Sequence, residues 1–223
     1  MKLEKTTRRY RDACGTAHAL DLIGERWALL VMRELMLGPK RFSDLKADLP
    51  GISANVLTQR LEGLEKTGLV RRRRLPPPAP AQVYELTDWG YEAEPIVQEL
   101  GRWATRSPAH DPTLPLSATS LMLSFRTMQS PERLGDLAAT IGFRIGAQGY
   151  VARIGGGRVH TERGDPEGAD AILAGAPEAI AGAVYGGVPL DALAAAGALK
   201  VEGDEALARR FVTLFPLPDK VRI

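Results

Sequence analysis

The stretch "GISANVLTQRLEGLEKTGLVRRRR", residues 51–74, joins the pattern of an amphipathic helix to a run of four arginines. Ser53 stands where a serine side chain can cap the first turn, and Gly68 is suited to end the helix. The apolar face consists of three leucines at helical spacing, Leu57, Leu61 and Leu64. The segment predicts a helix beside a basic strand, and its neighbours decide whether it binds a nucleic acid.

The residues before this helix predict two more helices. Four apolar residues recur at helical spacing, Trp27, Leu30, Val31 and Leu35, and Gly38-Pro39 ends the pattern. The stretch "SDLKADLP", residues 43–50, predicts a short helix that Ser43 caps and its final proline ends. Because a short turn containing Gly51 joins this helix to the next, the layout is that of a helix-turn-helix.

The residues after the arginines predict a β-hairpin. Two strand-like segments, residues 69–75 and 82–87, flank the stretch "PPPAPA". Proline there excludes a tight turn and favours a stiff, protruding loop. Thr87 can cap a closing helix over residues 88–104, which Pro95 is expected to bend. A helix, a turn, a second helix and a β-hairpin in this order predict a winged helix.

Three polar residues near the start of the capped helix are predicted to read DNA bases. At about 100° per residue, Asn55 and Gln59 point away from the leucine face, with Thr58 beside them. Asn and Gln can pair bidentately with adenine in the major groove, and each good pair contributes about 1–3 kcal/mol of discrimination. Ser53 can also donate to a phosphate.

The basic residues leave alternatives open. Arg60, on the flank of the helix, can reach a phosphate or pair internally with Asp44 or Asp48. The side chains of the arginine run alternate between two faces of a strand, so they either contact phosphates and the minor groove or form a charged, protected edge. Beside a helix-turn-helix and a wing, the first reading is favoured. The arginines expected at DNA are Arg41, Arg60, Arg71, Arg72, Arg73 and Arg74.

The charge distribution agrees with an anionic partner for one half of the chain. Residues 1–110 hold 18 Lys and Arg against 14 Asp and Glu, whereas residues 111–223 hold 11 against 13. The basic clusters lie at Arg8-Arg9, at Lys40-Arg41 and in the arginine run. Double-stranded DNA is therefore the expected partner.

Composition excludes several other classes of protein. No run of about 18 apolar residues is present, so no membrane partner is expected. The N-terminus lacks the apolar segment of a secretory signal, and a single cysteine excludes an intramolecular disulfide framework, so a cytoplasmic location is expected. His18, His110 and His160 are far apart and predict no metal site. No catalytic set is visible, so neither a cofactor nor enzymatic activity is expected.

The chain is long enough for two domains of ordinary size. Three prolines in residues 105–117 predict a connection, and the boundaries are placed at 1–106 for DNA binding and dimerisation, 107–116 for the linker and 117–223 for a second domain. The second domain should be α+β. Its expected elements are a strand over 117–128, a Ser130-capped helix whose apolar face includes Leu134, Leu137 and Ile141, strands joined at Gly155–Gly157, a strand and helix meeting near Gly175, and a closing helix, strand and helix.

Three segments of the first half are similar to the HxlR family of bacterial winged-helix regulators, which is related to the MarR regulators: "LIGERWALLVMREL", "RFSDLKADLPGISANVLTQRLEGLEKTGLVRR" and "VYELTDWGYEAEPIVQELGRWA". The resemblance implies a homodimer on a palindromic site, with Leu20 and Trp103 near the subunit interface. The wing here is more proline-rich than the family pattern. Cys14 matches a position where some members carry a redox-reactive cysteine, with Arg11 and His18 near enough to stabilise a thiolate; the alternative is a small packed residue.

The last part of the chain, residues 169–215, resembles sterol-carrier-protein-type domains, above all in "GGVPLDALAAAGALKVEGDEALARRFVTLF". Such domains enclose an apolar tunnel, so the resemblance implies a hydrophobic small-molecule ligand. The side chains expected to line it, or else to fill an ordinary core, are Phe125, Phe143, Tyr150, Ile180, Val184, Tyr185, Leu193 and Phe211.

Two functions remain open. The first is a dimeric DNA-binding transcriptional regulator whose second domain senses a hydrophobic molecule. The second is a hydrophobic-ligand carrier that uses its winged helix for dimerisation or protein contact. The basic, polar edge from Ser53 to Gln59 and the arginine run favour the first, because a contact module does not need them.

Overall fold

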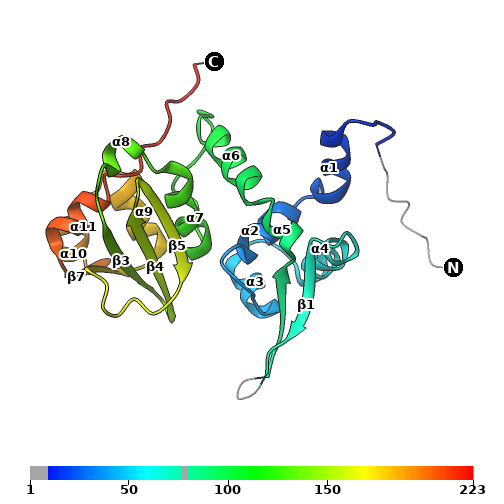
Figure 1. The fold of residues 1–223 in the computed structure, drawn as a ribbon, viewed down its shortest axis with the longest axis horizontal. Coiled ribbons are helices and arrows are strands. Elements are labelled where there is room, and N and C mark those ends of the chain that lie inside the picture. Colours follow the sequence, from blue (N-terminus) through cyan, green and yellow to red (C-terminus); the bar gives the residue numbers. More distant parts are fainter. Residues whose placement is uncertain (1–9, 77–79, 223) are drawn as a thin grey trace. The chain divides into compact units, whose positions relative to one another are not determined.

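The computed structural model describes residues 10–76 and 80–222 (Figure 1). The Arg8-Arg9 cluster and residues 77–79 of the proline-rich tip lie outside the described residues. The chain divides into two compact units, Met1–Glu94 and Pro95–Ile223. The division falls at the start of a helix, and residues 106–117 contain neither helix nor strand. The boundaries placed at 106 and 117 stay a prediction.

The first unit is a winged helix. Its elements are α1 (Gly15–Ile23), α2 (Ala28–Leu35), α3 (Phe42–Asp48), α4 (Ala54–Lys66), β1 (Val70–Arg74), β2 (Gln82–Leu86) and α5 (Asp88–Tyr91). Strands β1 and β2 pair antiparallel, with Val70 opposite Leu86 and Arg74 opposite Gln82, and Figure 1 shows them as a projecting hairpin. The core combines apolar residues of α2 with the leucine face of α4: Val31, Met32, Leu35, Leu57, Leu61 and Leu64.

Two helix starts differ from the prediction. Trp27 adopts the left-handed conformation with φ of 80°, so α2 begins only at Ala28. Helix α3 begins after Arg41, so Ser43 lies inside the helix and does not cap it. The turn between α3 and α4 is as predicted, and Gly51 takes a φ of 89° there, a conformation that glycine adopts without steric cost.

The predicted closing helix is two helices. Thr87 caps α5, where its hydroxyl accepts a hydrogen bond from the Gly90 amide at 3.1 Å. Helix α5 ends at Tyr91, and α6 (Glu94–Thr105) starts anew with Pro95 in its first turn. Proline lacks an amide hydrogen, which a first turn does not need, so it begins a helix here in place of bending one.

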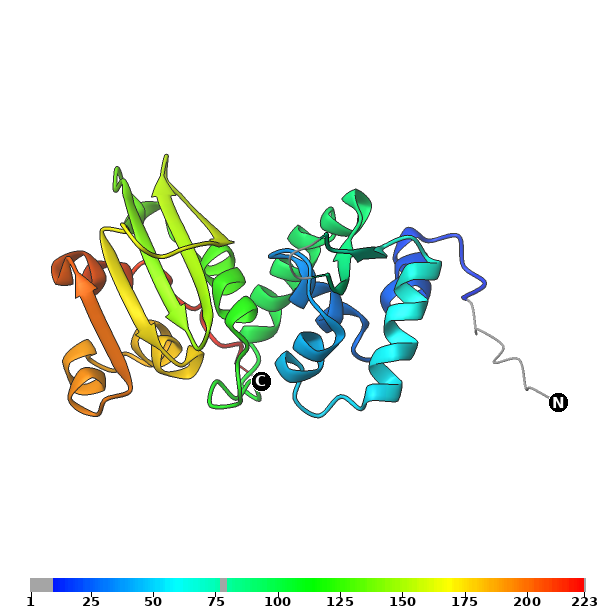
Figure 2. The ribbon, with the colours of Figure 1, turned by 90° about the horizontal axis from the view of Figure 1, so that it is seen from below.

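The second unit is α+β with a five-stranded mixed sheet. Besides α6 its elements are α7 (Ala118–Met128), α8 (Pro131–Leu134), β3 (Ala139–Ile145), β4 (Gln148–Gly155), β5 (Arg158–Arg163), β6 (Ala171–Gly175), α9 (Pro177–Tyr185), α10 (Leu190–Ala195), β7 (Leu199–Gly203) and α11 (Glu205–Phe211). The strand order is β5-β4-β3-β6-β7, and only the central β3–β6 pair is parallel (Figure 2).

Two predictions for this unit are wrong. Residues 118–128 form helix α7, not a strand, with Ser117 as the cap that accepts from the Ser120 amide at 3.0 Å. Helix α8 is a single turn that ends before Gly135, and residues 139–145 form strand β3. The Ser130 cap, the glycine hairpin turn and the helix–strand–helix ending are confirmed.

The helices cover one face of the sheet with an aromatic core. Phe125 of α7 lies 5.6 Å from Phe143 of β3 and 5.3 Å from Phe211 of α11, measured between ring centroids. Phe215 completes the cluster at 4.7 Å from Phe125. The opposite face carries ion pairs such as that of Arg153 with Glu162 at 2.9 Å. The sheet is therefore one half of a two-layer domain.

Candidate nucleic-acid interface

Helix α4 presents a polar edge near its N-terminus. The Ser53 hydroxyl accepts a hydrogen bond from the Val56 amide at 3.2 Å, so it serves as the cap. Asn55, Thr58 and Gln59 are exposed on the side away from the buried leucines. Among the described residues, none of these three side chains has a hydrogen-bond partner, so the edge is available to a ligand. Figure 2 shows α4, in cyan, along one side of its unit.

Arg60 is engaged within the protein. Its Nε donates to the carbonyl oxygen of Arg26 at 2.7 Å, and its Nη2 lies 2.8 Å from the Glu25 carboxylate. Neither of the internal partners considered from the sequence, Asp44 and Asp48, takes this role. The contact joins α4 to the segment before α2, so Arg60 helps to fix the orientation of α4.

Lys40 does not belong to a basic surface cluster. Its Nζ lies 2.6 Å from Glu34 and 2.5 Å from Asp48, and its side chain is only 1% exposed. Its backbone exchanges two hydrogen bonds with Tyr84 of the wing. The neighbouring Arg41 is exposed, with its amide donating to Asp44 at 3.2 Å. Only Arg41 of this pair is therefore accessible to an anion.

Three of the four wing arginines form ion pairs with glutamates. Arg71 and Arg73 lie 2.6 and 3.0 Å from the two carboxylate oxygens of Glu85 on β2. Arg72 makes a bidentate contact with Glu65 at the end of α4, where the shorter distance is 2.7 Å. Both glutamates were missed by sequence reasoning. The antiparallel register that places Glu85 opposite Arg71 is the signal that identifies the first of them.

Cys14 is exposed at the N-terminus of α1. Backbone N–H groups of Ala17 and Thr16, followed by the Thr16 hydroxyl, lower the pKa of its thiol because they favour the thiolate. The lowering thus arises from groups of the helix start and not from Arg11 or His18. Among the described residues, no group of three potential ligands could hold a metal ion.

The residues predicted to line a cavity in the second unit divide into two sets. Phe125, Phe143, Tyr150, Ile180 and Phe211 are fully buried, and the three phenylalanines belong to the aromatic core. Val184 and Tyr185 instead line an open hollow of about 570 Å³ beside α9, α10 and residues 212–217. Leu193 is half-buried on α10.

The hollow beside α9 is mostly apolar. Its aliphatic wall includes Val184, Val188, Leu190, Val212 and Leu217. Tyr185 lies in it, and its hydroxyl donates to Ser124 at 2.6 Å, while burial raises the pKa of that hydroxyl. Sequence reasoning missed the wall residues after α11, because the contact of that segment with α9 is a long-range one.

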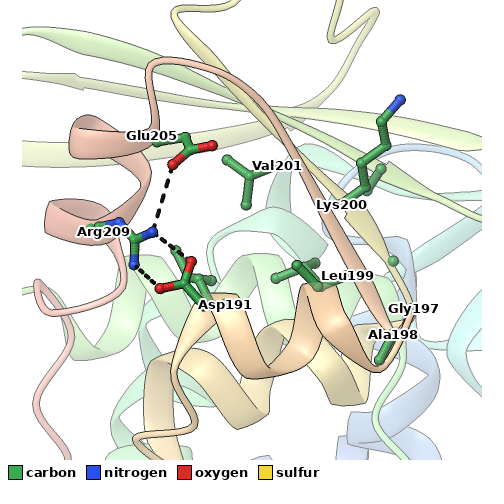
Figure 3. Close-up of a pocket in the computed structure, with 12 residues that line it drawn as sticks. Asp191, Gly197, Ala198, Leu199, Lys200, Val201, Glu205 and Arg209 are labelled. Atoms are coloured by element: carbon green, nitrogen blue, oxygen red, sulfur yellow. Dashed lines mark hydrogen bonds and ion pairs between the residues drawn. The ribbon is translucent and has the colours of Figure 1, made fainter.

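A second hollow, of about 450 Å³, lies beside α10 and β7 (Figure 3). Arg209 crosses one side of it, 2.6 Å from Asp191 and 3.6 Å from Glu205. The lining also includes the methyl groups of Ala194 and Ala198 and the backbone of Gly197. Because its charged groups neutralise one another, this hollow is less suited to a ligand than the apolar one.

Comparison with known proteins gives matches for both units. The HxlR-like helix-turn-helix family model matches residues 22–111, and the SCP-2 sterol transfer family model matches residues 121–216. The uncharacterized HTH-type transcriptional regulator YvaP of Bacillus subtilis (strain 168) is 40% identical over 87 residues, 39% of this chain and 81% of that protein. The HTH-type transcriptional regulator YodB of the same organism is 38% identical over 86 residues, 39% of this chain and 77% of that protein. The solved reduced form of YodB is 34% identical, with a TM-score of 0.40, and the match covers 45% of this chain and 100% of that chain.

A helix-turn-helix whose second helix is capped by Ser53, followed by a β-hairpin wing, defines the class of winged helix-turn-helix proteins. This chain belongs to the HxlR-like helix-turn-helix family, and it is an HTH-type transcriptional regulator that carries an SCP-2 domain in its C-terminal part. Both resemblances predicted from the sequence are confirmed. Regulators of this family bind DNA and are typically non-enzymatic. Within residues 10–76 and 80–222, no helix is long and apolar enough to cross a membrane.

Proposed function

We propose that the protein binds a palindromic operator as a homodimer, and that Asn55, Thr58 and Gln59 read the bases of each half-site. The observation that carries the proposal is the exposed polar edge of α4, whose side chains are not engaged within the described protein. Arg41 and the wing arginines supply contacts to phosphates, which strengthen binding without reading sequence.

The apolar face of α6 supports the homodimer. Ile96, Leu100 and Trp103 recur at helical spacing and are 58, 46 and 71% exposed, and no residue of α6 is buried. In α1, Leu20 is likewise 48% exposed. Exposed apolar stripes of this kind mark interaction sites. A second copy of the chain is the proposed partner, because a palindromic operator presents two equivalent half-sites.

The SCP-2 domain is proposed to bind a hydrophobic effector in the apolar hollow beside α9. The aromatic core fills the space between sheet and helices, so the ligand would bind at this open hollow and not in a central tunnel. An effector shifts DNA binding only if it has different affinities for the binding-competent and incompetent states.

We propose oxidation of the Cys14 thiol as a second trigger that alters DNA binding. The thiol is exposed, and its lowered pKa increases the thiolate fraction at neutral pH. Since the chain has one cysteine, a disulfide would join two subunits or a subunit and a small thiol.

The proposal is tested by fluorescence anisotropy with DNA from upstream of the protein's own coding sequence, titrated at several salt concentrations. We expect saturable binding that weakens as salt rises, and stronger binding to the upstream DNA than to a duplex of random sequence. Absence of salt-dependent binding to either duplex would refute the proposal. It would favour the carrier function, in which the winged helix is only a contact module.

A further inference from the structure

The wing holds an acidic residue between two of its arginines. The Glu85 side chain is 8% exposed, and its two oxygens receive Arg71 at 2.6 Å and Arg73 at 3.0 Å. Arg71 lies directly opposite Glu85 in the strand register, and Arg73 lies two residues further along the same face. A single carboxylate thus offsets two guanidinium groups on one face of β1.

A second glutamate holds the arginine on the other face. Arg72 donates through Nε and Nη2 to Glu65, and its guanidinium lies 5.5 Å from the centroid of the Tyr84 ring. Glu65 belongs to α4, the reading helix, and its side chain is 22% exposed. This contact ties the wing to the last turn of that helix.

The two carboxylates halve the charge of the arginine run. Four arginines and two glutamates leave a balance of +2, and among the described residues only Arg74 of the run forms no ion pair. The paired arginines remain 47–61% exposed, so a phosphate can reach them. The phosphate must compete with the carboxylate that the arginine already contacts. This competition reduces the binding free energy gained from each phosphate contact.

We propose that Glu65 and Glu85 limit the affinity of the wing for DNA, because they lower its sequence-blind attraction to phosphates. The inference rests on the proposed DNA-binding function. Specificity is the difference between the free energies of binding to the operator and to other DNA. Because phosphate contacts contribute alike to both, weakening them lowers both affinities and leaves that difference to the base contacts of α4. Arg74 is then the arginine of the run that can bind a phosphate without displacing a carboxylate.

The test compares Glu85→Gln and Glu65→Gln with the wild-type protein on a duplex of random sequence. Each variant keeps the size of the side chain and removes one negative charge. We expect about three- to tenfold tighter binding near 50 mM salt, and a plot of log affinity against log salt that is steeper by about 1. Glu92→Gln is the matched control, because Glu92 is exposed in the same unit and forms no ion pair within the described part of the chain.

The outcomes separate this inference from the proposed function. If the wild-type protein shows no salt-dependent DNA binding, both fail. If the wild type binds and both glutamate variants bind no tighter, or bind more weakly, the carboxylates only orient the arginines and the inference alone is overturned. An equal gain in Glu92→Gln would also overturn it, because net charge would then explain the effect. Melting temperatures identify any misfolded variant, and Glu65→Gln, at the more exposed site, keeps the test valid if Glu85→Gln unfolds.

Discussion

Lys40 and Glu34 form an ion pair of 2.6 Å inside the winged helix, where both side chains are almost completely buried. Asp48 adds a second carboxylate to the ammonium at 2.5 Å, and Arg33 adds a second cation to Glu34 at 2.8 Å. The lysine backbone pairs with Tyr84 of the wing. The network therefore joins α2, α3 and the wing through one residue.

Replacement of Lys40 by methionine should strongly destabilise the first unit. The change leaves two carboxylates close together without their shared cation, and breaking a buried pair costs about 3–5 kcal/mol. Chemical denaturation monitored by circular dichroism measures the change. Lys66→Met, at an exposed site on α4, should change the free energy of unfolding by no more than about 0.5 kcal/mol in either direction. The double variant Lys40→Met/Glu34→Gln should recover part of the lost stability. If it does not, the loss does not arise from the unpaired charge.

Gln59→Ala should reduce sequence discrimination without reducing binding to random DNA. Loss of a bidentate base contact costs about 1–3 kcal/mol, or about 5- to 150-fold in affinity for the preferred site. Competition binding with preferred and random duplexes measures the ratio. If both affinities fall by the same factor, Gln59 contacts the backbone and not a base.

Leu100→Glu should weaken the homodimer by at least about tenfold, because it places a charge in the centre of the apolar face of α6. Native mass spectrometry over a range of protein concentrations measures the fraction of dimer. Leu114→Glu is the control, since Leu114 is also exposed, at 63%, but lies outside α6. A dimer that survives Leu100→Glu unchanged would exclude this face as the interface.

Val184→Trp should weaken capture of a hydrophobic fluorescent dye by about tenfold, because the larger side chain occupies the hollow where the effector is proposed to bind. Val201→Trp places the same side chain in the second hollow and should leave dye binding unchanged. If the Val201 variant alone loses the dye, the ligand site lies beside α10 and β7. Native mass spectrometry of protein purified from its own host can identify a bound natural ligand.

The rate of Cys14 alkylation should rise with pH as the thiolate forms, and the midpoint of this rise should lie below the usual thiol pKa of about 8.5. The folded protein stabilises the charged form through backbone N–H groups, so the midpoint of the rate against pH should lie lower in the native than in the denatured protein. The protein has one cysteine, so the reaction reports on this site alone. Equal midpoints in the two states would exclude an activated thiol.

Local signals in the sequence predicted the winged helix well. The signals lie within one helix and its adjoining turn: the cap at Ser53, the turn at Gly51 and the three leucines of α4. Their spacing along the sequence therefore predicts their structure. The same reasoning failed for α7, because Leu121, Met122, Leu123 and Phe125 are all buried and the helix shows no clean apolar stripe. Continuous burial removes the periodicity on which the distinction between helix and strand depends.

The ion-pair partners of the basic residues could not be predicted from the sequence. Glu25 lies 35 positions before Arg60 in the sequence, and Glu34 lies six before Lys40, yet both contacts depend on how helices pack. Composition showed a basic half, but only the structure shows that most of its conspicuous cations already have anionic neighbours. The base-reading residues remain predictions because no DNA contact has been measured.

The parallel pairing of β3 with β6 affects the order in which the chain folds. Ile141 aligns with Ala171, so the centre of the sheet forms only after the whole β4–β5 hairpin has been synthesised. The wing closes over a shorter span, from Val70 to Leu86. Because distant contacts slow folding and synthesis proceeds from the N-terminus, we expect the winged helix to acquire its structure on the ribosome first. Pulsed hydrogen exchange on stalled nascent chains would detect this sequence of events.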